Sequence, residues 1–157
     1  MNWVRIDNRL VHGQVIEAWI PYLGSRSILV VNDELADDAM RQEIIRLAVP
    51  GGIELSFIKV ERVGAYLDDQ GRVSHPGGDT LLLFATCCDV HRALQAGFSL
   101  STVNIGNLHY APGKQQLCAH VALSNEDIGC LKAFVKRGIR LDFRCVPDDT
   151  TQVKRSW

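Results

Sequence analysis

One short stretch of the sequence concentrates side chains that handle phosphate. His12 lies within a few residues of two arginines, an acid and an amide, which are Arg5, Arg9, Asp7 and Gln14. A neutral imidazole is a nucleophile, and guanidinium groups grip a phosphoryl group in a fixed fork. Positive neighbours also disfavour the imidazolium form, which leaves a neutral ring free to attack. The stretch therefore predicts a histidine that accepts a phosphoryl group.

Two neighbours of His12 have alternative interpretations. Asp7 either orients a ring N–H of His12 or holds an arginine, and in the simplest interpretation it only pairs with Arg9 in the loop. Gly13 lets an anion approach the backbone closely. A single histidine near the start of a helix is more often structural than catalytic, so the prediction rests on these neighbours.

The elements around His12 suit an anion. The apolar run 3–6 predicts a strand, and the amphipathic pattern 13–22 predicts a helix directly after the loop. The free N–H groups and the dipole at the start of a helix both favour negative charge. His12 is therefore expected at a strand-to-helix turn that attracts phosphate.

Strands alternate with helices along the rest of the chain. Apolar runs predict further strands at 27–31, 53–58, 80–84, 101–105, 116–123 and 139–146. Amphipathic segments predict helices at 34–49, 60–69, 87–96 and 124–137, and polar residues 70–79 predict a loop. This order predicts one α/β domain over residues 1–157. It has a doubly wound, mostly parallel central sheet with helices on both faces.

The carboxyl ends of the strands are the expected binding edge of such a sheet. The loops near Asn32, Thr86 and Gly106 would meet the His12 loop there. Residues 104–110 are either an ordinary turn into a β ribbon or one wall of the His12 site. We expect the phosphate contacts to come from Arg5, Gly13, Gln14, Thr86 and Gly106.

Other chemistries have weaker support. The net charge of −1 gives no sign of nucleic-acid binding, and neither a P-loop nor a G-x-G-x-x-G motif is present. The remaining histidines have no paired metal-ligand spacing: His75, His91, His109 and His120. Cys87 at a helix start is a weaker candidate nucleophile.

Cysteine usage and hydropathy indicate the compartment. The five cysteines are odd in number, Cys87 and Cys88 are adjacent, and no C-x-x-C pair occurs. We interpret them as reduced, mostly buried thiols. No apolar run approaches membrane length, and Arg5 and Asp7 interrupt any signal-peptide pattern. A cytoplasmic protein is expected.

Residues 5–15, Arg-Ile-Asp-Asn-Arg-Leu-Val-His-Gly-Gln-Val, resemble the phosphorylation-site signature of a known family. That family is the IIB components of the mannose/sorbose type of the sugar phosphotransferase system. Similar segments follow at 31–34, 103–110 and 146–147, so the resemblance covers nearly the whole chain.

The resemblance implies a function. His12 would accept a phosphoryl group on Nδ1 from a phosphohistidine of a IIA domain, and would pass it to a sugar held by the membrane subunits IIC and IID. The protein would be a phosphotransferase component attached peripherally to the membrane permease. Arg9 matches the arginine that stabilises the phosphoryl group, and Asp7 and Gly13 match their motif positions. No metal or nucleotide cofactor is required, because the phosphohistidine donor is itself reactive.

Two positions depart from the family pattern. Asn8 replaces an acid, which makes the loop more favourable to phosphate. Ala85 stands where relatives commonly have a basic residue, so a cation that would hold phosphate or partner is missing.

Sugar and assembly are less constrained. Residues 106–116 resemble members associated with N-acetylgalactosamine, while mannose, fructose and sorbose remain open. Relatives are often dimers, so a homodimer is among the expected assemblies. The docking face is expected to surround His12 and to include Arg5 and Arg9. Trp19 either belongs to this face or packs in the core under the first helix. The alternatives are a regulatory phosphocarrier that signals sugar status and an anion-binding module without phosphotransfer.

Overall fold

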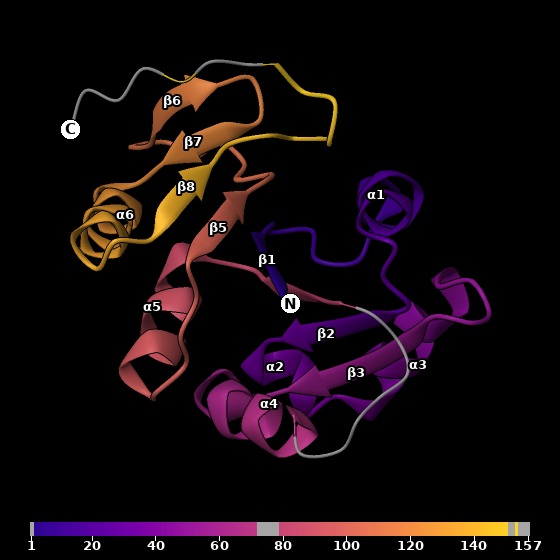
Figure 1. Cartoon of the computed structure of the whole chain (residues 1–157). Helices are drawn as coiled ribbons and strands as arrows, with labels where there is room; N and C mark the ends of the chain where they lie inside the picture. Colours follow the sequence, from indigo (N-terminus) through magenta and orange to yellow (C-terminus); the bar gives the residue numbers. More distant parts are fainter. Residues whose placement is uncertain (1, 72–78, 151–152, 154–157) are drawn as a thin grey trace.

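The chain forms a six-stranded parallel sheet, seen in a computed structural model that describes residues 2–71, 79–150 and 153 (Figure 1). The strand order is β3-β2-β4-β1-β5-β8, and every paired neighbour is parallel. The bounds are β1 Trp3–Ile6, β2 Ser27–Val31, β3 Glu54–Ile58, β4 Thr80–Phe84, β5 Thr102–Ile105 and β8 Arg140–Asp142. The predicted fold class is confirmed, and β1 occupies the interior position that lets its loop become a site.

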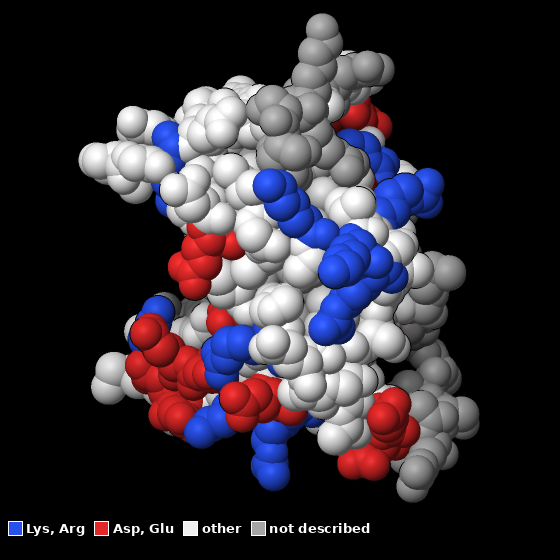
Figure 2. Space-filling model, turned by 90° about the vertical axis from the view of Figure 1, so that its left-hand side faces the viewer, with Lys and Arg blue, Asp and Glu red and all other residues white. Residues whose placement is uncertain are grey.

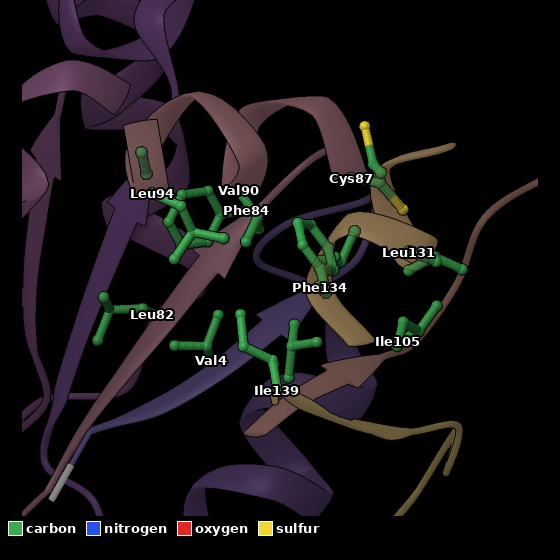
Figure 3. Packing of buried hydrophobic residues seen from close by; sticks show 14 of the residues in the cluster. Val4, Leu82, Phe84, Cys87, Val90, Leu94, Ile105, Leu131, Phe134 and Ile139 are labelled. Carbon is green, nitrogen blue, oxygen red and sulfur yellow. The ribbon is translucent and has the colours of Figure 1, made fainter. Parts of the chain in front are cut away.

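One face of the sheet carries an extensive apolar core. It is covered by α4 (Val63–Gly71), α5 (Cys87–Gln95) and α6 (Asn125–Lys136). Phe84 of β4 and Phe134 of α6 are both fully buried in this cluster (Figure 3). The predicted helix start at Ser124 is confirmed as a capping box, in which Ser124 and Asp127 satisfy each other's backbone N–H.

The opposite face is covered by η1 (Val15–Trp19), α1 (Ile20–Leu23) and α3 (Ala39–Ala48). Helical backbone begins at Gly13 and runs through a π-helical turn at η1 into α1. Trp19 is fully buried here and stacks on Trp3 with ring centroids 5.6 Å apart. Core packing is thus the correct interpretation of Trp19, which does not contribute to a docking surface.

The predicted helix over 34–49 is two helices. A short α2 (Asp33–Ala36) ends before Asp38, whose carboxylate accepts the backbone N–H of Arg41 and starts α3. An acid at this position competes with the helix backbone and favours a cap. Three apolar side chains of α3 are exposed: Met40, Ile44 and Leu47.

The later part of the chain differs in two further elements. The predicted strand 116–123 is a hairpin, β6 (Gln115–Cys118) with β7 (Val121–Leu123), that pairs antiparallel in a separate small sheet. The last strand β8 is shorter than the predicted 139–146 because the chain turns away after Asp142. The predicted helix 60–69 begins as the 3₁₀ turn η2 (Val60–Arg62) before α4. Most of the predicted loop 70–79 lies outside the described residues.

On the face shown in Figure 2, acidic and basic side chains mix at one end, and a separate group of basic side chains lies near the middle. None of the five cysteines is in a disulfide; Cys87 and Cys130 are buried, and Cys88, Cys118 and Cys145 are partly buried. Among the described residues, no helix has both the length and the hydropathy to cross a bilayer.

Candidate phosphoryl-transfer site

The loop after β1 lies at a point where the sheet changes the face on which its helices pack. The helical segment after β1 covers one face, and α5, which follows the neighbouring strand β4, covers the other. Adjacent loops that diverge in this way leave a crevice at the carboxyl edge of the sheet, which is the usual ligand site of such folds. The loop that carries His12 is one side of that crevice.

Backbone hydrogen bonds hold the loop against both neighbouring strands. Asp7 N donates to Phe84 O at 2.8 Å, and Asn8 N donates to Asn107 O at 2.9 Å. Leu10 then adopts a φ of 54°, the left-handed region that a leucine rarely occupies. A strained residue of this kind persists where the surroundings require it, and such residues cluster at functional sites.

His12 is directed by Asp7. Ring atom Nε2 lies 2.8 Å from Asp7 Oδ2, and the His12 side chain is only 7% exposed. The carboxylate can only accept, so Nε2 carries the hydrogen, and in the neutral ring Nδ1 carries the free electron pair. Nδ1 is buried and has no hydrogen-bond partner. The geometry therefore leaves one ring nitrogen available as a nucleophile.

Arg5 holds Asp7 in place through hydrogen bonds and charge. Its Nη2 and Nε lie 3.0 and 3.2 Å from Asp7 Oδ2, and its Nη1 donates to Asn104 Oδ1 at 2.6 Å. Nη1 also donates to the backbone carbonyl of Arg144. Arg5 is fully buried, so its predicted place on a docking face is wrong, and its guanidinium is occupied by protein groups.

These contacts keep Asp7 ionised. Burial raises the pKa of Asp7, but the hydrogen bond from His12, the charge of Arg5 and the hydrogen bond from Asn107 outweigh it and lower the pKa to about 2. Burial also lowers the pKa of Arg5, against the opposing effect of Asp7. Asp7 and Arg5 are thus a buried ion pair next to His12.

A second chain of contacts reaches Asp7 from the β5 loop. Asn107 Nδ2 lies 2.8 Å from Asp7 Oδ2 and 2.9 Å from Gln14 Oε1. Gln14 Nε2 in turn donates to Cys145 Sγ at 3.5 Å. Residues 104–107 therefore form one wall of the His12 site, and the amide of Gln14 is engaged with this wall.

Because Gly106 has no side chain, the backbone of residues 104–107 packs directly against Arg5. A Cβ added at this position would lie 2.2 Å from Arg5 Cζ, far inside any real contact distance. Gly106 N also donates to Ile6 O at 2.8 Å. The structure thus places Gly106 against Arg5 rather than at the open surface.

The other predicted residues lie at the rim. Arg9 is exposed, and its backbone N donates to Asp7 Oδ1 at 3.0 Å, so the expected Asp7–Arg9 contact runs through the main chain. Gly13 is exposed directly after His12 and has open space around it. Thr86 is exposed at the end of β4, where its hydroxyl caps α5, and among the described residues it makes no hydrogen bond to the His12 cluster.

Sequence reasoning missed the part played by individual residues of two later segments. The side chains of Asn104 and Asn107 were expected only as members of a loop, although their spacing around a glycine at a strand end was the available signal. Nothing in the sequence pointed to Arg144 and Cys145. Arg144 packs its guanidinium 5.5 Å from the Trp19 ring centroid and pairs with Asp142. Cys145 O accepts the indole N–H of Trp19 at 3.0 Å.

The donor set does not suit a metal. Among the described residues, no group of three or more His, Cys, Asp or Glu side chains could hold an ion. The buried polar cluster instead consists of one acid, one guanidinium and amides around one imidazole, which suits group transfer to a nitrogen.

Comparison with known proteins shows the family to which the chain belongs. Residues 1–155 match the family described as the phosphotransferase-system sorbose subfamily IIB component. The chain is 33% identical over 146 residues to the sorbose-specific EIIB component of Klebsiella pneumoniae, covering 92% of this chain and 87% of the relative. It is 32% identical over 145 residues to the mannose-specific EIIAB component of Escherichia coli (strain K12), covering 92% of this chain and 44% of that relative.

A solved structure gives the same result. The IIBSor domain of the sorbose permease from Klebsiella pneumoniae superposes with a TM-score of 0.83 at 32% identity, covering 97% of this chain and 93% of that one. The chain therefore belongs to the sorbose-subfamily IIB components of the sugar phosphotransferase system. It is a phosphotransferase-system component of sugar transport.

Proposed function

We propose that this chain is a cytoplasmic IIB phosphocarrier in which Nδ1 of His12 takes a phosphoryl group from a IIA phosphohistidine and delivers it to a sugar during uptake. The single observation that carries the proposal is the contact between His12 Nε2 and Asp7 Oδ2 at 2.8 Å, which leaves Nδ1 without a partner. His91 also has a buried Nδ1 without a partner, so the carboxylate against Nε2 is the feature that distinguishes His12.

The transfer is a displacement at phosphorus. The electron pair of His12 Nδ1 forms a new P–N bond while the P–N bond of the donor histidine breaks, and the donor ring, protonated on its other nitrogen, leaves as neutral imidazole. His12 keeps the hydrogen on Nε2, so its phosphorylated ring is a cation. The ionised Asp7 lies against that hydrogen and stabilises the new positive charge.

Groups at the rim of the site balance the negative charge of the phosphoryl group itself. The exposed guanidinium of Arg9 is within the same loop, and it can form a bidentate contact with phosphoryl oxygens. Helical backbone starts at Gly13, directly after His12, so the first N–H groups of that helix have no acceptor within it. Buried Arg5 acts one step away by holding Asp7.

Partners follow from family membership. The relative named as a mannose-specific EIIAB component joins a IIB-like region to more chain, and its name includes IIA, which supports a IIA domain as donor. The acceptor is a sugar presented by membrane subunits IIC and IID, with the carrier docking from the cytoplasm. We propose a hexose or an N-acetylated amino sugar such as N-acetylgalactosamine, because relatives are named as specific for sorbose and for N-acetylgalactosamine.

A phosphorelay tests the proposal. The protein is mixed with phosphoenolpyruvate, the general relay proteins and a IIA domain, and the phosphate is mapped by intact mass, acid lability and ³¹P spectra. One acid-labile phosphoryl group on Nδ1 of His12 is expected, and His12→Ala should abolish it without unfolding the chain. The matched control is His109→Ala, which removes an exposed histidine of the neighbouring loop and should still be phosphorylated. Phosphorylation of His12→Ala would exclude His12 as acceptor.

A further inference from the structure

Hydrogen bonds fix both the side chain and the backbone of Asn107. Its amide nitrogen lies 2.8 Å from Asp7 Oδ2 and 2.9 Å from Gln14 Oε1, so both amide hydrogens have acceptors. Its carbonyl accepts the backbone N–H of Asn8 at 2.9 Å. The residue is 9% exposed. Each of these contacts ends on the loop or the helix start that flanks His12.

The oxygen that Asn107 contacts is the one that receives the His12 hydrogen. Asp7 Oδ2 accepts from His12 Nε2 at 2.8 Å and from the buried guanidinium of Arg5. A carboxylate held from one side only can rotate away from the ring, whereas donors from Arg5 and Asn107 approach it from two different strands. The direction of Oδ2 is therefore determined by the β1 and β5 segments together.

We propose that Asn107 is a positioning residue for phosphoryl transfer at His12. It holds Asp7 Oδ2 against ring atom Nε2 and ties that contact to Gln14 in the first turn of the following helix. Nδ1 thereby stays the ring nitrogen with the free electron pair, at a set distance from the helix start. This inference rests on the proposed function and extends it by one residue.

A purely structural role predicts a different pattern. The loop is already closed by backbone bonds, from Asn8 N to Asn107 O and from Gly106 N to Ile6 O at 2.8 Å. The side chain of Asn107 adds hydrogen bonds to Asp7 and Gln14, and its Oδ1 accepts a long contact from Cys145 Sγ at 3.9 Å. Because its amide nitrogen is engaged with Asp7 and Gln14, its loss should change the rate constant of transfer and leave the KM for phosphorylated IIA unchanged.

The test compares wild type, Asn107→Ala and Ser124→Ala with the full relay. We expect Asn107→Ala to slow transfer about tenfold or more at unchanged KM. We also expect ¹⁵N spectra of the His12 ring to show the Nδ1–H tautomer, which is absent from wild type. Ser124→Ala removes the cap of α6, so it lowers the unfolding midpoint without changing the rate or the tautomer.

Each outcome decides a different question. Wild-type rate and tautomer in a folded Asn107→Ala would overturn the positioning role. If that variant does not fold, Asn107→Asp decides, because it keeps the size of the side chain and turns an acceptor toward Asp7; transfer at the wild-type rate at pH 8 would refute the role. If the wild type is not phosphorylated on His12, the proposed function fails, and the ring spectra still report whether Asn107 sets the tautomer.

Discussion

The two sides of strand β1 face different surroundings, although Trp3 packs against an apolar cluster on the Arg5 side. Val4 and Ile6 point into the apolar cluster beneath α5 and α6, where Phe134 is fully buried. Arg5, on the other side, points into a buried cluster of charges and amides that ends at His12. Alternation along one strand thus separates a core that needs only shape and volume from a core that needs particular hydrogen-bond partners. Substitutions on the two sides should therefore differ in what they damage.

The largest effect is expected at Gly106. Gly106→Ala places a methyl group 2.2 Å from Arg5 Cζ, so the buried guanidinium must leave its partners. An overpacked site with a displaced buried charge should lower the free energy of unfolding by about 5 kcal/mol, measured by urea denaturation. Gly129→Ala in α6 is the control, because open space surrounds that position and alanine favours a helix. Equal stability of the two variants would mean that the polar core adapts as readily as the apolar one.

The next effect lies on the apolar side. Phe134→Ala removes a fully buried ring between α6 and the sheet, and it should cost about 4 kcal/mol of unfolding free energy. The transfer rate per folded molecule should stay at the wild-type value, because the ring belongs to the opposite face from Arg5 and Asp7. A lower rate, measured well below the unfolding midpoint of the variant, would show that the two cores are coupled.

Acid should weaken the polar side specifically. The pKa of Asp7 is about 2 in the folded chain and near its ordinary value of 3.8 in the unfolded chain. Above pH 4 both states are ionised and the stabilisation is complete. Between about pH 4 and 2 the unfolded state binds the proton first, so about 2 kcal/mol is lost.

The matched variant for this measurement is His12→Ala. The hydrogen bond from His12 is the foremost of the contacts that lower the pKa of Asp7, so the variant should lose less stability over the same interval. Denaturation with urea at several pH values between 5 and 2 gives both curves. Parallel curves would contradict a role for His12 in the ionisation of Asp7.

The smallest change in stability is expected at the rim. Arg9→Lys should shift the unfolding free energy by less than about 0.5 kcal/mol, since the side chain is exposed. Transfer should slow about tenfold, because lysine cannot form a bidentate contact with a phosphoryl group. Arg26→Lys, at another exposed arginine, is the control. Unchanged transfer in Arg9→Lys would remove this guanidinium from the reaction.

Sequence reasoning reached the strands and the first loop for physical reasons. Continuous apolar runs such as 27–31 and 80–84 are the signature of strands buried on both faces, and both were predicted with the observed bounds. The helix over 34–49 was wrong because Asp38 is a better cap than a helix interior residue, and no periodicity measure weighs that competition.

The position of the site was predicted from the sequence, but only some of its hydrogen-bond partners were. Asp7 was expected to orient His12 or to hold an arginine, and it does both. The arginine it holds is Arg5, which was predicted to lie on the docking face around His12 and is instead fully buried. Its partners Asn104 and Arg144 are distant in sequence, and one sequence does not show which distant residues meet.

The contact between Arg5 and the carbonyl of Arg144 has a consequence for synthesis of the chain. His12 and Arg5 are synthesised before Arg144, whose carbonyl accepts from the Arg5 guanidinium and lies 139 residues later along the chain. Asn104 also donates to that same carbonyl. A growing chain therefore holds His12 long before it holds all the hydrogen-bond partners of Arg5, so the buried polar cluster beside His12 is completed only after β8 has been synthesised.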